Sequence, residues 1–213
     1  MDEAEFQVLS PKPVGYEEAL RRAWDALSGA DAAELAARKG VEVRSDGAIE
    51  LPFLAEVYRV DLKGRRVLDA AGGEVYPFLR VLLLHYLCGD SGAEPTGEWL
   101  GFRQLRGGET YFPAFAARTS RRLAAVFGGR ERLLYEAAEA LDGRKLAFGD
   151  ASCAFDVFPR ASMAVVLHAS CEDFGAEAAV LFDSAAPKHL ETEDLAVCGA
   201  FLTSRLCKPY EDK

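Results

Sequence analysis

The densest group of reactive side chains lies between Asp183 and Asp194, where an expected buried strand gives way to an expected helix. Connections of this kind often present functional groups. Asp183, His189 and Glu193 offer two carboxylates and one imidazole, a mixed ligand set that divalent metals accept. A metal held there would lower the pKa of a bound water and supply hydroxide near neutral pH. In the structural alternative, Asp183 caps a turn while Glu193 and Asp194 complement the helix dipole.

A second feature is local positive charge between Gly101 and Arg132. Seven arginines lie in this stretch against two glutamates, which gives it a charge of +5 inside a chain of net charge −9. Arg118, Arg121 and Arg122 are spaced so that they share one face of a helix. Clustered arginines can bind carboxylate or phosphate groups through paired hydrogen bonds. The structural alternative is a basic helix face that meets only solvent.

Other polar residues are expected to serve the fold. His85 and Cys88 stand three apart on an apolar segment and could face one metal, but they share a stripe with core residues, so we expect packing. The tetrad 89–92, Gly-Asp-Ser-Gly, resembles the nucleophile loop of chymotrypsin-like proteases, yet it closes an expected helix and predicts a turn. The chain contains no GxGxxG, Walker A or HExxH motif, so dinucleotide, NTP and zincin functions lack their usual support.

Composition narrows the class of protein. A chain of 213 residues, 50% hydrophobic and 10% aromatic, can bury the core of one globular domain. The acidic balance disfavours general nucleic-acid binding, which uses a basic surplus. No apolar run approaches the roughly 18–20 residues of a membrane span. We therefore expect neither nucleic acid nor membrane as a partner.

The start of the chain and its cysteines indicate a location. The acidic segment Met1–Glu5 does not resemble an export signal. The five cysteines form no CxxC pair, which argues against a zinc finger or an iron–sulfur cluster held by this chain alone. We expect a cytoplasmic protein with reduced thiols. These cysteines are Cys88, Cys153, Cys171, Cys198 and Cys207.

Hydrophobic periodicity predicts an α+β fold with an antiparallel or mixed sheet, because helices and strands come in runs instead of alternating strictly. The expected single domain, 1–213, contains a helical pair at 16–39, strands within 41–68, central helices within 77–141, and strands with a final helix within 145–207. In the middle of the chain, the pattern predicts a strand over 99–105 and helices over 114–127 and 130–141.

The order of several motifs resembles a family of uncharacterised prokaryotic domains, a domain of unknown function frequent in anaerobes and sometimes joined to an iron–sulfur cluster domain. The likeness runs from Tyr16 to Leu206. Its motifs are Leu51-Pro52-Phe53-Leu54, Tyr58-Arg59-Val60, Leu83-Leu84-His85-Tyr86-Leu87, Thr96-Gly97-Glu98-Trp99-Leu100-Gly101-Phe102-Arg103, Gly107-Gly108 before Tyr111, Pro159-Arg160, Leu181-Phe182-Asp183-Ser184-Ala185-Ala186, His189-Leu190 and Glu193-Asp194-Leu195. The resemblance implies no established activity or cofactor, but it indicates polar residues to test: Glu98, Arg103, Tyr111, Arg160, Asp183, His189 and Glu193.

Three hypotheses follow for the function. The first is an accessory or binding protein for a small anionic ligand or cofactor, based on the arginine-rich middle beside the aromatic residues Trp99, Tyr111 and Phe112. The second is a protein–protein interaction module that serves an anaerobic metalloenzyme. It rests on the resemblance, in which the family accompanies iron–sulfur domains, and on an expected acidic surface. The third is a metal-dependent enzyme that uses the carboxylates and imidazole between Asp183 and Glu193.

Overall fold

The computed structural model describes residues 15–170 and 175–211; the acidic start Met1–Glu5 and Cys171 lie outside them. The first part of the chain forms the expected helical pair, α2 (Tyr16–Ala26) and α3 (Ala32–Lys39). Four antiparallel strands follow, in the order β1 (Glu42–Val43), β2 (Ile49–Phe53), β3 (Glu56–Asp61) and β4 (Arg66–Leu68). Asp46 and Gly47 form the turn between β1 and β2, and Gly47 has a φ of 83°. The predicted helices and strands of this segment are confirmed.

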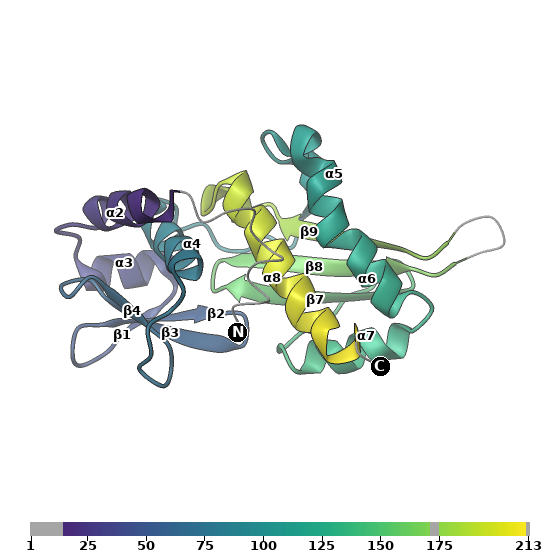
Figure 1. Cartoon of the computed structure of the whole chain (residues 1–213), viewed down its shortest axis with the longest axis horizontal. Helices are drawn as coiled ribbons and strands as arrows, with labels where there is room; N and C mark the ends of the chain where they lie inside the picture. Colours follow the sequence, from purple (N-terminus) through teal and green to yellow (C-terminus); the bar gives the residue numbers. More distant parts are fainter. Residues whose placement is uncertain (1–14, 171–174, 212–213) are drawn as a thin grey trace.

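A leucine-rich helix, α4 (Pro77–Cys88), fills the space between this small sheet and the rest of the molecule. Pro77 occupies its first turn, where a missing N–H costs nothing. Leucines at consecutive positions 82–84 are all buried, so the helix has no fully solvated face there. It packs along α2 (Figure 1).

The second half of the chain forms a larger antiparallel sheet, with the strands in the order β5-β9-β8-β7-β6. Their bounds are β5 Trp99–Gly101, β6 Arg144–Lys145, β7 Ala151–Phe158, β8 Ala161–His168 and β9 Glu177–Asp183. Helices α5 (Gly108–Arg118), α6 (Ser120–Phe127), α7 (Glu131–Glu139) and α8 (Thr192–Glu211) pack with this sheet, and α8 runs obliquely across its front in Figure 1. Two short 3₁₀ turns, Phe102–Gln104 (η1) and Ala186–Lys188 (η2), follow β5 and β9.

One contiguous hydrophobic core joins the two sheets, so the predicted α+β single-domain fold is confirmed. Aromatic rings connect the halves: Phe53 of β2 lies 5.0 Å from Phe158 of β7 and 5.4 Å from Phe201 of α8, centroid to centroid. The backbone N–H of Leu54 also donates to the carbonyl of Val157, at 3.0 Å. Among the described residues, no helix is both long enough and apolar enough to cross a membrane.

The middle of the chain differs from its prediction. The expected strand over 99–105 ends at Gly101, and η1 replaces its second half. The helix expected from residue 114 begins at Gly108 and breaks at Thr119, which separates α5 from α6. Thr119 is fully buried and its hydroxyl donates to the carbonyl of Phe115, at 2.8 Å, where it stabilises the break. Strand β6 is short and contains only Arg144 and Lys145.

Candidate functional site: a basic groove along strand β9

A tight turn takes the chain out of the sheet directly after β5. The Gln104 side chain accepts a hydrogen bond from the backbone N–H of Gly101 at 2.6 Å, which closes η1. Gly107 has a φ of 74°, in the left-handed region that favours glycine. At Gly108 a Cβ would lie 1.9 Å from the carbonyl oxygen of Phe102, so only glycine fits. The chain therefore leaves the sheet after three paired residues and starts α5.

This early exit leaves much of the outer edge of β9 without a strand partner. β5 pairs with β9 only from Gly101 opposite Leu181 to Trp99 opposite Asp183. Backbone groups alternate between the two sides of a strand, and the N–H of Ser184 donates to Glu98 on the β5 side, at 2.8 Å. By this alternation, Val180 and Ala178 direct their N–H and C=O groups to the same side. Val180 lies opposite Phe102, the residue that follows β5, so Ala178 is the one of the two that lies beyond this segment.

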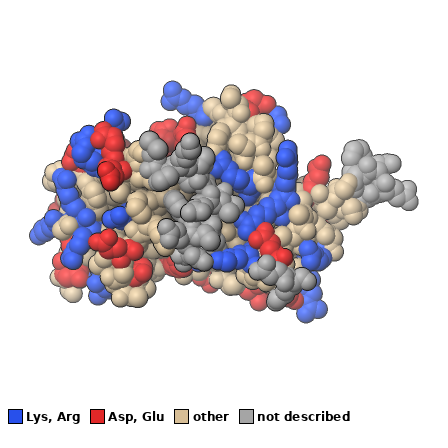
Figure 2. Space-filling model, in the orientation of Figure 1, with Lys and Arg blue, Asp and Glu red and all other residues tan. Residues whose placement is uncertain are grey.

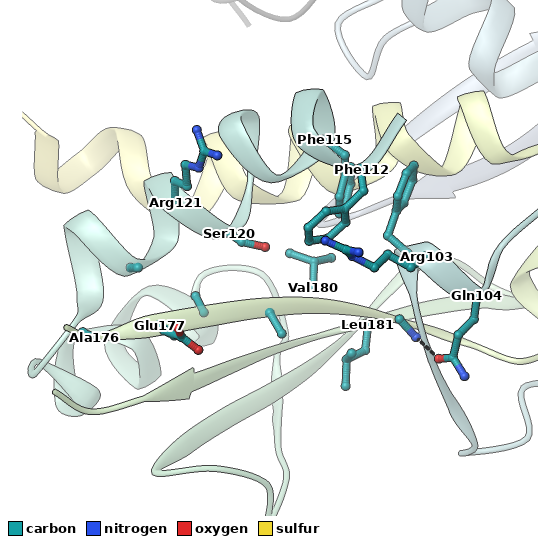
Figure 3. Close-up of a pocket in the computed structure, with 15 residues that line it drawn as sticks. Arg103, Gln104, Phe112, Phe115, Ser120, Arg121, Ala176, Glu177, Val180 and Leu181 are labelled. Carbon is teal, nitrogen blue, oxygen red and sulfur yellow. Dashed lines mark hydrogen bonds between the residues drawn. The ribbon is translucent and has the colours of Figure 1, made fainter. Parts of the chain in front are cut away.

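A groove of about 580 Å³ runs along this open edge (Figure 3). Every residue from Ala176 to Leu181 lines it. Successive side chains of a strand point to opposite faces of a sheet, so a groove that meets six in a row follows the edge of the strand. Residues after β5 and on α5 and α6 form the opposite wall: Gly101, Phe102, Arg103, Gln104, Phe112, Phe115, Ser120, Arg121 and Ala124.

Two arginines are among the residues that line the groove. In Figure 3, Arg103 extends from the end of β5 beneath α5 and into the groove, whereas the guanidinium of Arg121 on α6 points away from β9. The Arg103 guanidinium stacks on Phe112, 4.1 Å from the ring centroid, and pairs with exposed Glu109 at 2.7 Å. Arg121 forms no ion pair within the described part of the chain. Glu177 lines the groove near its other end and brings the one negative side chain among the lining residues.

The other arginines of the basic stretch are engaged elsewhere. The break at Thr119 places Arg118 on α5, where its guanidinium lies over the ring of Tyr111. Arg122 lies on α6 and forms an ion pair with Glu211 of α8 at 2.5 Å. Arg132 pairs with Glu136 one helical turn away. The predicted shared ridge of Arg118, Arg121 and Arg122 is therefore split between two helices. On the face in Figure 2, basic side chains gather over α5, α6 and α8.

The predicted ligand-binding residues do not form one pocket. Arg103 lines the groove. Trp99 is the first residue of β5, Glu98 precedes it, and Tyr111 lies on α5 with 41% of its surface exposed. None of these three lines the groove. Asp183, Arg160 and His189 lie elsewhere and make structural contacts.

Asp183 anchors the loop before β5. Its buried carboxylate accepts backbone hydrogen bonds from Gly97 at 2.7 Å, from Ala185 at 2.8 Å and from Thr96 at 3.0 Å. These bonds engage both carboxylate oxygens at one corner of the sheet. Asp183 thus has the capping role that the structural alternative predicts.

His189 and Arg160 belong to a cluster around a fully buried lysine, Lys39, at the end of α3. His189 Nε2 lies 2.9 Å from the carbonyl oxygen of Ala93. A carbonyl oxygen can only accept a hydrogen bond, so Nε2 carries the proton of the imidazole ring. The other ring nitrogen, Nδ1, therefore accepts a hydrogen bond from Lys39 Nζ at 3.4 Å. Burial lowers the pKa of Lys39 to about 8 and lowers that of His189. The Tyr86 hydroxyl donates to the Lys39 carbonyl at 2.9 Å. Arg160 bonds the Ala37 carbonyl at 3.2 Å and pairs with Glu94.

A second pocket, of about 560 Å³, opens beside this cluster between the end of α4 and the start of α8. His85 and Cys88, expected in the core, both line it. His85 Nδ1 lies 3.0 Å from both carboxylate oxygens of Asp194, and this hydrogen bond raises the pKa of His85. Burial raises the pKa of Cys88 to about 11, so the thiol is a weak nucleophile at neutral pH.

The predicted metal ligands are not brought together. His189 and Glu193 line the second pocket, but Asp183 does not, and its oxygens are held by backbone N–H groups. No group of three or more His, Cys, Asp or Glu side chains within 15–170 and 175–211 is arranged to hold a metal ion. In the structure, Asp183 anchors a loop, and His189 accepts a hydrogen bond from Lys39.

The sequence profile of a family described as a domain of unknown function, DUF3786, matches residues 31–205. The chain belongs to the DUF3786 family. No curated protein and no solved structure matches it. The match to the DUF3786 family covers both sheets, the groove along β9 and the cluster around Lys39.

Several structural features near the candidate site of this DUF3786 protein were missed from sequence. Lys39 is the last residue of the short helix α3, whose last turn is basic. A lysine at the end of a helix is favoured by the helix dipole and is ordinarily exposed, so the sequence predicts an exposed Lys39 side chain. The partnership of His85 with Asp194 joins residues 109 positions apart, which local spacing does not reveal. The open edge of β9 results from the early end of β5. The pair Gly107-Gly108 predicts an end of the strand after residue 105, and the structure ends the strand earlier, at Gly101.

Proposed function

We propose that this DUF3786 protein is a binding protein whose basic groove along β9 holds carboxylate or phosphate groups. The observation that carries the proposal is Arg103, whose guanidinium extends into a groove that β9 lines on its other side, with Arg121 also among the lining residues. Guanidinium groups bind such anions through two parallel hydrogen bonds. Backbone N–H groups of an unpaired edge are further donors for an anionic ligand.

The contacts of Arg103 in the free protein favour the binding of an anion. Its stacking on Phe112 holds the planar guanidinium in place, so less side-chain freedom is lost when a ligand arrives. Its partner Glu109 is 69% exposed, and ion pairs of this kind contribute only about 0–1 kcal/mol. A ligand carboxylate can replace Glu109 at little cost.

The groove chemistry favours binding over catalysis. Its polar side chains are two arginines, Gln104, Ser120 and Glu177, beside the phenylalanines of α5. Arginine remains protonated at any pH at which the protein is folded, so it positions charge and does not transfer protons.

Isothermal titration calorimetry with citrate and pyrophosphate tests the proposal. We expect Arg103→Ala and Arg121→Ala each to weaken binding about tenfold or more, since a hydrogen bond to a charged group contributes about 1.5–3 kcal/mol. Arg132→Ala is the matched control, because it removes the same charge from a side chain that is 93% exposed and outside the groove. If all three variants lost the same affinity, the effect would come from the net charge of the protein and not from the groove. If neither citrate nor pyrophosphate bound to the protein, the proposal would be overturned.

We further propose a cytoplasmic location, supported by the free thiols Cys88, Cys153, Cys198 and Cys207. The resemblance to a family that is frequent in anaerobic prokaryotes adds the prediction of a protein–protein interaction module that serves an anaerobic metalloenzyme. Copurification from the native host tests it: a stable metalloenzyme partner supports this role, and a lone protein with a bound anion contradicts it.

A further inference from the structure

We infer that the ligand of the groove is a small monocarboxylate with an apolar body, of which a medium-chain fatty acid is the simplest example. The inference rests on the proposed function, because Arg103 holds the carboxylate. It goes further by specifying the rest of the ligand, namely its single charge, its apolar character and its limited length. Each of these properties follows from a different part of the groove.

Charge sets the number of anionic groups on the ligand. The Arg103 guanidinium extends beneath α5 into the groove, whereas the guanidinium of Arg121 points away from β9 (Figure 3). Glu177 lies toward the other end of the groove and brings a negative charge there. One guanidinium binds one carboxylate through two parallel hydrogen bonds. A ligand with a single carboxylate therefore matches the groove better than a polyanion, whose further charges would lie near Glu177.

The walls of the groove favour an apolar body. Phe112 of α5, Ala124 of α6 and Ala178 of β9 all line the groove, and each is half-buried. A ligand that covers these side chains removes apolar surface from water, which is favourable in proportion to the area covered. The backbone N–H and C=O of Ala178 also face the groove. Because Ala178 is only half-buried, water still reaches these two groups beside a narrow ligand.

The strand edge that faces the groove is covered at both ends, which limits the length of the ligand. At one end, β5 pairs with Leu181, so the following residue, Phe102, lies opposite Val180. At the other end, Gly128 directly after α6 packs against Ala176, since a Cβ on Gly128 would lie 2.5 Å from the Ala176 Cβ. The stretch between these two ends spans roughly 13 Å. A groove of about 580 Å³ with such ends suits a small molecule and leaves no exit for a polymer.

Isothermal titration calorimetry of the full chain with butanoate, hexanoate and octanoate tests the inference. Each methylene group that enters the groove should strengthen binding about two- to fourfold, so we expect octanoate to bind at least about tenfold more tightly than butanoate. Octylammonium is the matched control, because it has the same apolar chain and a positive charge that Arg103 repels. Equal affinity for butanoate and octanoate would overturn the inference. Octylammonium that bound as tightly as octanoate would also overturn it.

A substitution on α6 tests whether the apolar body lies in the groove. Ala124→Phe narrows the groove and leaves Arg103 in place. Ala125→Phe is the matched control, since Ala125 is exposed on the same helix and does not line the groove. We expect Ala124→Phe to weaken octanoate binding at least about tenfold, and Ala125→Phe to leave it within about threefold of the wild type. Equal octanoate affinity in the two variants would overturn the inference.

Methyl signals of ¹³C-labelled protein give a second readout that does not depend on variants. Titration with octanoate should shift the methyl signals of Ala124 and Ala178 until the protein is saturated. Val57 of β3 is the internal control, because it is 47% exposed and lines a different pocket. Shifts confined to Val57 would place the apolar chain in that other pocket and would overturn the inference.

The variant Arg103→Ala separates this inference from the proposed function. The proposed function requires that citrate binding depends on Arg103, and the inference requires in addition that affinity rises with chain length. If citrate binding depends on Arg103 but octanoate binds no more tightly than butanoate, only the inference is overturned. If neither citrate nor octanoate binding depends on Arg103, the proposed function is overturned together with the inference.

Discussion

Gly101 pairs with Leu181, and it is the last residue of β5 that pairs with β9. The turn that follows lifts the chain into α5, so Arg103 and Phe112 come to lie above an edge that β5 would otherwise cover. One short connection thereby creates both walls of the groove. The end of β5 is consequently as important for the proposed function as the arginines.

The glycine at the end of this turn should be indispensable. In Gly108→Ala the new Cβ would lie 1.9 Å from the Phe102 carbonyl oxygen, so the backbone must move. We expect a loss of about 2–4 kcal/mol in the free energy of unfolding, measured by urea denaturation. Gly101→Ala is the control in the same turn, because its Cβ makes only ordinary contact, 3.5 Å from Gln104. Similar stability of the two variants would show that the turn is not as tight as described.

Removing the charge of Glu109, which competes with the ligand for Arg103, should strengthen citrate binding. Glu109 pairs with Arg103 at 2.7 Å and must be displaced by an incoming carboxylate. Glu109→Gln keeps the size of the side chain and removes its charge, so we expect citrate to bind about two- to fivefold more tightly, in line with the modest energy of an exposed pair. Calorimetry measures the change, and Glu136→Gln, which frees Arg132 outside the groove, is the control. Weaker binding to Glu109→Gln would mean that Glu109 orients Arg103 for the ligand.

Asp183 should matter for stability. In Asp183→Asn, an amide NH₂ replaces an oxygen that accepts backbone hydrogen bonds, so a donor would face the N–H of Thr96, Gly97 or Ala185. We expect a loss of about 2–4 kcal/mol in the free energy of unfolding. Ser184→Ala, which removes only the exposed hydroxyl contact with Thr96, should cost less than about 1 kcal/mol. An unchanged urea midpoint for Asp183→Asn would refute the anchoring role.

The buried amine of Lys39 should make stability depend on pH. Burial lowers its pKa in the folded protein from 10.5 to about 8, so the unfolded chain binds more protons between these values and stability rises with pH across that range. Other groups also titrate between these pH values. Their contribution is the same in the variant Lys39→Met, so the difference between the two proteins reports Lys39 alone. We expect the wild type to gain about 1–3 kcal/mol relative to Lys39→Met between pH 7.5 and pH 10.5, measured by urea denaturation. Parallel pH profiles would contradict the low pKa of Lys39.

The fold was largely predictable from sequence, and the reason is periodicity. Leu195, Cys198, Leu202 and Leu206 recur at helical spacing, and all four residues are buried in α8. The continuous apolar run from Met163 to Leu167 predicted an interior strand, and β8 lies between β7 and β9. Periodicity predicted the wrong end for β5, because the geometry of the backbone determines where that strand ends. Leu100 and Phe102 continue an apolar alternation, but the turn closed by Gln104 ends the strand.

The site was predictable only in part, because its members come from distant segments. Arg103 and Arg121 belong to the basic stretch that predicted an anion site, yet the sequence gives no reason to separate Arg121 from Arg122, which pairs with Glu211. Asp183 and His189 had the residue types of metal ligands. Their partners, the Gly97 backbone and Lys39, lie far away in the chain and decide their roles.

The central claim is that the groove along β9 binds an anion, and chemical-shift mapping of ¹⁵N-labelled protein during a citrate titration tests it most directly. We predict saturable shifts of the Nε–H signals of Arg103 and Arg121 and of the backbone amides of Gly101, Ala178 and Val180. Residues of the second pocket, such as His85 and Asp194, should stay unchanged. Shifts confined to that second pocket, or changes spread over arginines outside the groove without saturation, would contradict the account.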